Sequence, residues 1–233
     1  MDMTIGTWHI SVERTPPTSA ELATMYDHAA RHWQQSLHRQ GYDRAYRDLF
    51  RRLREQGMLH GLEQGRRVLD AGIGPGALSL ALTETLPAPI QIDGVDISAG
   101  MLAEARQTLT RVGVPVQTHQ QDIHRLPFAD NSFDMVMGAH LLEHLEDPER
   151  GLAEMTRVLR PGAPLLVIVT RQGLFDALLQ LKWRYSPILP QQLAAWMRAS
   201  GRRSRASTPR SAWCPGVWKR ASRPRWSSPN SPR

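Results

Sequence analysis

Residues 68–82 are VLDAGIGPGALSLAL, in which a short apolar stretch leads into a helical one through a glycine-rich turn. Val68–Ala71 is expected to be a buried strand. Gly72, Gly74 and Gly76 alternate in the turn, where the missing Cβ atoms let the backbone approach a bound ligand closely. The spacing also satisfies the GxGxxA form of the dinucleotide fingerprint, so the turn alone leaves the ligand open.

Strands and helices alternate on both sides of this turn. The pattern predicts strands at 68–71, 90–95, 114–118, 133–138 and 164–169, with helices at 75–86, 100–112, 149–159, 173–185 and 191–200. Alternation of this kind is typical of an α/β fold with a doubly wound, mostly parallel sheet. Ligands of such sheets bind beyond the carboxyl ends of the strands.

Two more helices are expected ahead of the first strand. Thr18 or Ser19 is the predicted N-cap of a helix that runs to about Arg39, and Gly41 separates it from a second helix at 42–56. The expected organisation is a flexible arm (1–17), lid helices (18–60), a catalytic domain (61–200) and a basic tail (201–233).

Acidic residues follow the next two strands. Asp96 lies 20 residues after Gly76, where a carboxylate can accept both ribose hydroxyl protons. Asp122 and Ile123 follow the third strand and suit an adenine amino group and ring face, and Ile97 can cover the other face. Each Asp alone could be a helix N-cap, but their recurrence at successive strand ends favours an adenosyl site.

Three segments in this order resemble class I S-adenosylmethionine-dependent methyltransferases, in the small-molecule branch often called type 11. They are VLDAGIGPGALSLAL (68–82), IDGVDISAGMLAEAR (92–106) and QDIHRLPFADNSFDMVMGAHLLEHLEDPERGLAEMTRVLRPGAPLLVI (121–168). The resemblance covers roughly 67–170. It implies a Rossmann-like fold and methyl transfer from S-adenosyl-L-methionine to an O, N or C atom of a small molecule.

The resemblance also implies which residues hold the cofactor. Tyr26 and Trp33 lie in a stretch similar to the family's N-terminal tyrosine motif, whose aromatic residues close over cofactor and acceptor. The implied residues are Asp70, Gly72, Gly74 and Gly76 for the methionine moiety, Asp96 for the ribose, Ile97, Met101, Asp122 and Ile123 for the adenine, and Tyr26 and Trp33 for the lid.

His140 is the candidate catalytic residue, because it follows the fourth strand and imidazole titrates near neutral pH. The alternative is that it caps a helix or contacts the cofactor through its backbone. The segment 140–144 also spells H-x-x-E-H, a zinc-peptidase pattern. No third ligand is evident, so no metal is predicted. His28 and His32 share the same spacing and are expected to be solvated.

The net charge of +7 belongs to the end of the chain. Nine of the 29 Lys and Arg residues lie after Ser200 with no Asp or Glu, so the first 200 residues carry 20 basic against 22 acidic groups. No nucleic-acid partner is therefore expected for the folded domain. No apolar run suits a membrane span or a secretory signal, and Cys214 is the single cysteine, which predicts a cytoplasmic protein.

The last 33 residues depart from the family pattern, which continues with two more strands. Residues 201–233 contain five prolines, seven serines and three tryptophans but no Ile or Leu, so disorder is expected. An out-of-frame translation and a natural basic tail that binds nucleic acid or anionic lipid both fit. The apolar face of the helix at 173–185 favours packing in the core, and it would also suit the wall of a pocket for an apolar or amphiphilic acceptor or contact with a membrane surface. The rival functions are an NAD(P)-dependent oxidoreductase and a non-catalytic cofactor-binding or tail-mediated nucleic-acid-binding protein.

Overall fold

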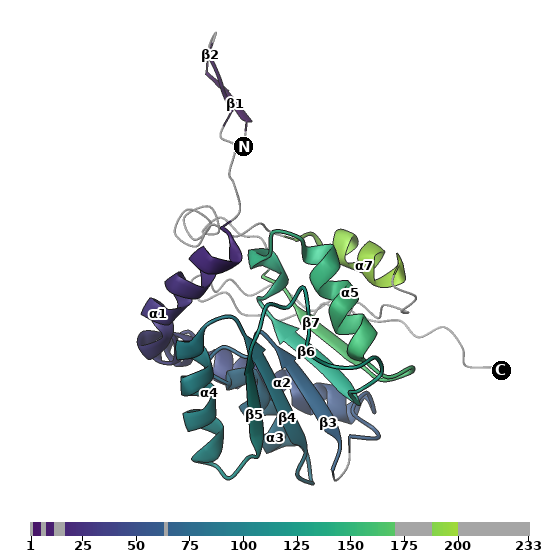
Figure 1. The fold of residues 1–233 in the computed structure, drawn as a ribbon. Coiled ribbons are helices and arrows are strands. Elements are labelled where there is room, and N and C mark those ends of the chain that lie inside the picture. The colour runs from purple at the N-terminus through teal and green to yellow at the C-terminus, as the bar shows by residue number, and fades with distance from the viewer. Residues whose placement is uncertain (1, 6–7, 12–16, 63–64, 171–187, 200–233) are drawn as a thin grey trace, which may run out of the picture.

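The computed structural model describes residues 2–5, 8–11, 17–62, 65–170 and 188–199. Five strands form one sheet in the order β5-β4-β3-β6-β7, and every neighbouring pair is parallel. The strands are β3 (Arg67–Ala71), β4 (Gln91–Asp96), β5 (Val116–Gln120), β6 (Met135–Ala139) and β7 (Leu165–Ile168). The predicted doubly wound parallel sheet is confirmed (Figure 1).

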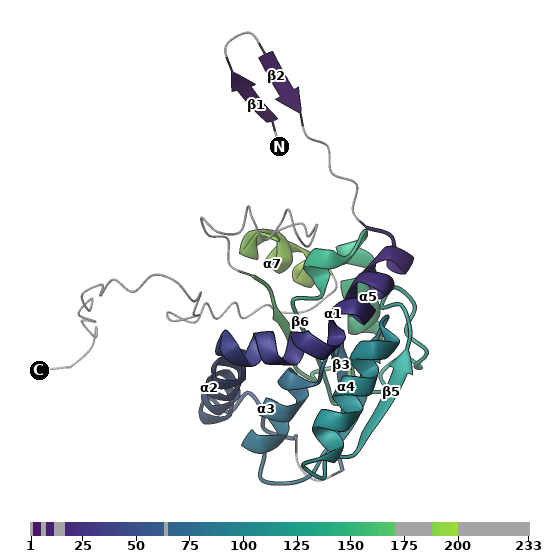
Figure 2. The ribbon, with the colours of Figure 1, turned by 90° about the vertical axis from the view of Figure 1, so that its left-hand side faces the viewer.

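Helices cover both faces of this sheet (Figures 1 and 2). They are α1 (Ser19–Arg39), α2 (Tyr42–Glu55), α3 (Ala77–Thr85), α4 (Ala99–Thr110), α5 (Pro148–Val158) and α7 (Pro190–Ala199), with a 3₁₀ turn η1 at Leu142–His144. One buried cluster joins α2, α3 and α4 to the sheet through Phe50, Leu82 and Leu102. A second cluster joins α5 and α7 to the opposite face through Leu152 and Leu193.

The helix starts follow from local hydrogen bonding. Thr18 caps α1: its side chain accepts from the Glu21 N–H, while the Glu21 carboxylate accepts from the Thr18 N–H. Gly41 has φ 77°, a left-handed conformation that glycine adopts readily, and it separates α1 from α2 as the sequence predicts. α3 begins at Ala77, two residues after the predicted start, because Gly76 is also left-handed, with φ 86°.

Two predictions are corrected. Asp2–Ile5 (β1) and Trp8–Ser11 (β2) pair as an antiparallel hairpin, whereas the sequence predicts a loose arm there. The β-branched residues Thr4, Ile5 and Ile10 favour this extended backbone. The helix expected after β6 is only the short turn η1.

The predicted helix at 173–185, the tail at 201–233 and any strands within that tail lie outside the described residues. Among the helices that the structure describes, none is both long and apolar enough to span a bilayer.

The core supports a matched stability test. Val68 lies at the centre of the sheet and is 0% exposed, whereas Val112 is 56% exposed. Val68→Ala should lower the free energy of unfolding by about 2 kcal/mol, since it removes two buried carbon atoms and leaves a cavity. Val112→Ala should change it by less than about 0.5 kcal/mol. Urea unfolding measures both, and equal losses would contradict the assigned core.

Candidate active site

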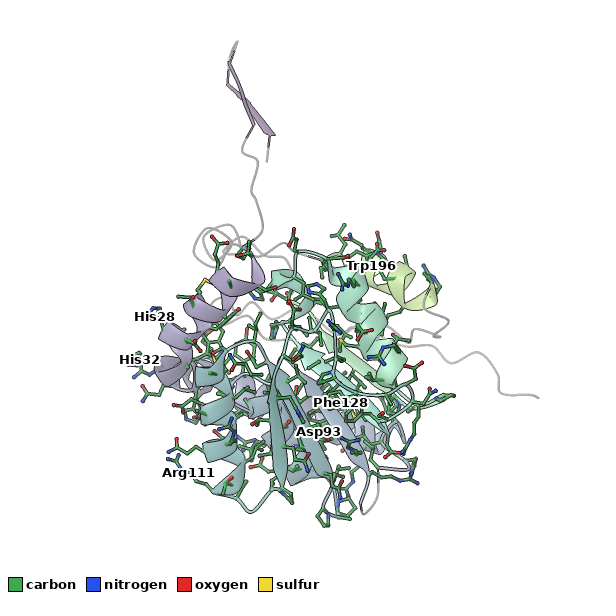
Figure 3. All side chains as sticks on the ribbon, in the orientation of Figure 1. His28, His32, Asp93, Arg111, Phe128 and Trp196 are labelled. Carbon is green, nitrogen blue, oxygen red and sulfur yellow. The ribbon has the colours of Figure 1, made fainter. Side chains whose placement is uncertain are left out.

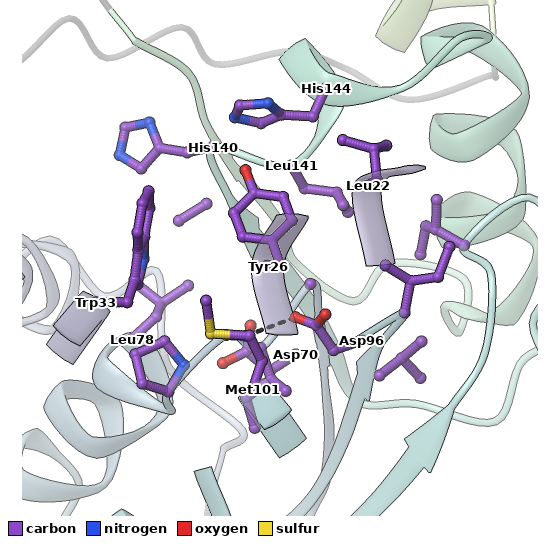
Figure 4. A pocket seen from close by; sticks show the side chains of 18 of the residues that line it. Leu22, Tyr26, Trp33, Asp70, Leu78, Asp96, Met101, His140, Leu141 and His144 are labelled. Atoms are coloured by element: carbon purple, nitrogen blue, oxygen red, sulfur yellow. Dashed lines mark hydrogen bonds between the residues drawn. The ribbon is translucent and has the colours of Figure 1, made fainter. Parts of the chain in front are cut away.

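A cavity of about 380 Å³ lies beyond the carboxyl ends of the central strands, beneath α1 and α2. Figure 4 shows side chains of α1, among them Tyr26 and Trp33, gathered with those of the strand ends, among them Asp70 and Asp96. It brings together the predicted residues Tyr26, Trp33, Asp70, Gly72, Gly74, Asp96, Ile97, Met101, Asp122, Ile123 and His140. Gly76 is the one predicted site residue outside the lining. Gly76 is the N-cap of α3, and its φ of 86° is a left-handed conformation that favours glycine.

Asp96 joins two loops at the floor of the cavity. One carboxylate oxygen accepts from the Gly74 N–H and the other from the Ser98 N–H, each at 2.9 Å. Burial raises the pKa of this carboxyl despite these hydrogen bonds. Gly72 has φ 69°, and a Cβ on it would lie 2.9 Å from Leu141 Cδ1. The turn thus needs glycine at this position.

Asp70 is a second buried carboxyl at this floor. It is 1% exposed, and its Oδ2 accepts from Ser79 Oγ on α3 at 2.6 Å. Burial raises the pKa of Asp70 from 3.8 to about 7, although the Ser79 hydrogen bond opposes the shift. Two carboxyl groups with raised pKa values therefore lie side by side at the ends of β3 and β4.

Asp122 lies at the other end of the cavity and is tied to the lid. Its Oδ2 accepts from Ser19 Oγ at 2.7 Å, and its Oδ1 accepts from the His124 N–H at 2.9 Å. Burial alone would raise the pKa of Asp122, but the Ser19 and His124 hydrogen bonds outweigh it and lower the pKa. Its neighbour Ile123 is 5% exposed and gives this end an apolar wall.

Helix α1 closes the cavity from above. Tyr26 packs edge-on against Trp33, with ring centroids 5.7 Å apart, and against His144 at 5.8 Å (Figure 4). Asp27 holds the helix down, since its carboxylate accepts from Ser98 Oγ at 2.5 Å and from the Gly100 N–H at 2.9 Å. These contacts place α1 over the loop that contains Asp96, in the position the sequence predicts for a lid.

His140 follows β6 directly and adopts φ 53°, which is uncommon for a residue other than glycine. Its Nδ1 lies 3.0 Å from Thr170 Oγ1. Its Nε2 is buried without a hydrogen-bond partner among the described residues. Burial lowers the pKa of His140 to about 4, so the imidazole is neutral at neutral pH.

The metal interpretation of H-x-x-E-H does not fit this geometry. His140 precedes the short turn η1 and contacts Thr170, while His144 packs on Tyr26, so the two histidines do not share one helix face. His28 and His32 are exposed on the outer face of α1, as predicted (Figure 3).

The cavity also contains residues to which the sequence analysis assigned no site role. Ser19 and Thr170 belong to this group, and Glu143 lies directly behind the lining, in contact with Thr170. Tyr42 and Tyr46 on α2, within the predicted lid helices, line the cavity as well. Two features of the sequence could have drawn attention to Glu143 and Thr170: an acidic residue inside H-x-x-E-H, and a hydroxyl residue just after the fifth strand. Neither predicts the contact between them, because that contact depends on the pairing of β6 with β7.

The fold and the strand-end loops define a nucleoside-type site on a doubly wound sheet. Residues 69–167 match the model of the methyltransferase domain family. Demethylmenaquinone methyltransferase of Porphyromonas gingivalis is 33% identical over 156 residues, which are 65% of this chain and 61% of that protein. Ubiquinone/menaquinone biosynthesis C-methyltransferase UbiE of Haemophilus ducreyi is 36% identical over 134 residues, 56% of this chain and 52% of that protein.

A solved structure of the [4+2]-cyclase SpnF has a TM-score of 0.64 at 24% identity, covering 81% of this chain and 75% of that one. The chain spans between about half and three fifths of the two curated relatives. In its fold and in its match over residues 69–167, the α/β domain is similar to the class I S-adenosylmethionine-dependent methyltransferases. The glycine turn by itself also fits a dinucleotide-binding fingerprint. The match to the methyltransferase domain model favours the methyltransferase over a dinucleotide-binding protein.

The raised pKa of Asp70 predicts a specific pH dependence of stability. A carboxyl with a pKa of about 7 when folded and near 3.8 when unfolded contributes stability below about pH 4 that is lost as the pH rises through 7. Asp70→Asn removes this titration, so the stability of the wild type relative to the variant should fall between about pH 4 and 7. Urea unfolding across this range measures the difference, with Asp48→Asn, at a half-exposed position on α2, as control. A difference that stays constant with pH would contradict the assignment.

Proposed function

We propose that this protein transfers a methyl group from S-adenosylmethionine to a small-molecule acceptor in the cavity beneath α1 and α2. The observation that carries the proposal is the convergence of three strand-end loops on one cavity, through Gly74, Asp96 and Asp122. When bound, S-adenosylmethionine supplies an electrophilic methyl carbon on a positively charged sulfur. The protein has to bind the reactants, align them and exclude water.

The cavity residues fit this cofactor. Each Asp96 oxygen accepts one backbone N–H and keeps lone-pair capacity for a ribose hydroxyl. A Cβ at Gly74 would meet no atom within 4 Å, so the backbone lies open to the cavity there. Met101 is 2% exposed and, with Ile123, offers apolar surface to an adenine ring. In this proposal Asp70 lies at the methionine end of the cofactor, where its ionised form favours the positive charge of the ligand.

The acceptor would lie beside His140. Trp33, Tyr42 and Tyr46 line this end of the cavity, and the Tyr42 ring lies 5.5 Å from the His140 ring. Aromatic walls of this kind suit a flat, uncharged ring. Since the two curated relatives act in demethylmenaquinone and ubiquinone/menaquinone chemistry, we propose a hydroxylated aromatic acceptor of the hydroquinone type.

His140 would act as the general base on this acceptor. Its neutral Nε2 has a lone pair and no other partner among the described residues. The acceptor O–H bond breaks, the proton moves to Nε2, and the electron pair stays on the oxygen and enriches the neighbouring ring carbon. That carbon is the proposed methylation site, and after methylation its own hydrogen leaves as a proton while the oxygen is protonated again, so that the ring regains its aromaticity. Helices α1 and α2 would serve as the lid that keeps water out.

Cofactor binding can be tested before any acceptor is known. Isothermal titration of the full chain with S-adenosylhomocysteine should give measurable heat, and NAD should give none. Asp96→Asn should weaken the affinity about tenfold or more, because an amide is a poorer acceptor for two hydroxyl donors. The Asp48→Asn variant, at a half-exposed position on α2 outside the cavity lining, should bind like the wild type. Absence of heat with S-adenosylhomocysteine would remove the proposal.

The acceptor class needs a separate measurement. Methyl-labelled S-adenosylmethionine is incubated with a reduced demethylmenaquinone analogue or with phosphatidylethanolamine vesicles. Label should enter the hydroquinone ring, and His140→Gln should lower the rate about 100-fold or more, within the range expected for a general base. Labelling of the amine lipid alone would overturn the aromatic acceptor while leaving methyl transfer in place.

A further inference from the structure

We infer that Glu143 and Thr170 are positioning residues that fix the ring of His140 and stabilise its protonated form. The inference rests on the proposed role of His140 as a base, and it adds two residues to which nothing in the sequence assigns a role. The observation behind it is a connected set of polar contacts behind the imidazole, on the side away from Nε2.

Thr170 links the other two residues. Its backbone N–H donates a short hydrogen bond to Glu143 Oε1, and its hydroxyl lies 3.0 Å from His140 Nδ1. The second carboxylate oxygen of Glu143 lies 3.8 Å from the same Nδ1. The arrangement depends on the parallel pairing of β6 with β7, which places residue 170 beside residue 140: the His140 N–H donates to Ile168 O at 2.8 Å.

Glu143 is an unusual residue to bury. It is 2% exposed, and an acidic side chain in the interior is costly unless paired and hydrogen-bonded. Every element that packs against His140 and Glu143 contributes a further titratable group. They are Tyr26 on α1, Tyr42 and Tyr46 on α2, Asp70 on β3 and His144 on η1. Among these neighbours the Glu143 carboxylate is the nearest acid to the His140 ring.

These contacts set the proton positions on the ring. In this inference Glu143 is ionised. Its charge 3.8 Å from Nδ1, with the Thr170 hydroxyl as the acceptor at 3.0 Å, favours the tautomer that has its proton on Nδ1. The Nε2 lone pair then faces the cavity. When Nε2 takes a proton, the imidazolium forms in a buried place, and the adjacent carboxylate offsets that cost. Without Glu143 the buried ring would be a weaker base.

The left-handed backbone of His140 supports the same interpretation. A φ of 53° is strained at a residue other than glycine, and such strain persists where the surroundings impose it. Here the His140 N–H bond to Ile168 O and the Nδ1 contact with Thr170 hold the residue at both ends. A purely structural role for Glu143 would join η1 to the end of β7 without affecting the imidazole.

Nuclear magnetic resonance on the full chain with ¹⁵N-labelled histidine, saturated with S-adenosylhomocysteine, separates these two roles. The His140 signals are identified by their loss in His140→Gln. The wild type should carry its proton on Nδ1. In Glu143→Gln the pKa of the ring should fall by about one unit or more, because the charge partner is gone. Glu149→Gln, an exposed glutamate on α5, should leave both unchanged.

Kinetics provide the second readout. Glu143→Gln should lower kcat about 10- to 100-fold with S-adenosylhomocysteine affinity kept within about twofold, and should move the acidic limb of the kcat–pH profile to lower pH. Thr170→Val should lower kcat similarly, and Thr170→Ser should restore it. If Glu143→Gln does not fold, the comparison of Thr170→Val with Thr170→Ser still tests the positioning role.

The two proposals fail separately. An unchanged tautomer and pKa in Glu143→Gln overturn the positioning role, even if the protein binds cofactor and methylates its acceptor. A lower kcat with an unmoved pH limb also overturns it, because a structural defect would do the same. Absence of S-adenosylhomocysteine binding overturns the proposed function, while the histidine spectra of the free protein still show whether Glu143 controls His140.

Discussion

The site depends on one carboxylate that accepts a backbone N–H from each of two loops. Asp96 at the end of β4 accepts from Gly74 in the glycine turn and from Ser98 at the start of α4. The Gly72 and Ile73 N–H groups both donate to Val95 O, so the turn is fixed to β4 by backbone and side chain together. Because the loops are held by main-chain donors, their shape depends little on the side chains that face the ligand. The wall of the cavity can therefore vary while its floor keeps its form.

The floor is also electrostatically one-sided. Asp70, Asp96 and Glu143 are acidic groups in or behind the lining, and the lining residues that the structure describes include no Lys or Arg. His140 and His144 have pKa values lowered to about 4 by burial, so they add no positive charge at neutral pH. A cavity of this kind favours a ligand with a positive centre over a neutral or anionic one. A sulfonium is such a positive centre, whereas the thioether left after methyl transfer is neutral. The cavity therefore favours the sulfonium ligand over the thioether.

Much of this architecture could be predicted from the sequence because it follows local rules. The alternation of apolar strands and helices predicts the sheet, and the glycine turn and the acidic residues at strand ends predict residues that line one cavity. Gly76 lies outside that lining, as the N-cap of α3. Thr18 and Gly41 set helix limits through hydrogen bonds within a few residues. The contacts of Glu143 with Thr170 and of Ser19 with Asp122 could not be predicted, since they join residues 27 and 103 positions apart. Only the packed sheet and the docked helix bring such pairs together.

The hydrogen bond between Ser19 and Asp122 has a consequence for ligand entry. Ser19 is the first residue of α1, and its hydroxyl already uses Oδ2 of the carboxylate that an adenine amino group would approach. An incoming donor must share that oxygen or displace the hydroxyl. In either case a nucleobase at this position would change the hydrogen bond that holds the first turn of α1. Binding at the adenine end of the cavity would thus act on the start of α1, and the same helix covers the end of the cavity beside His140.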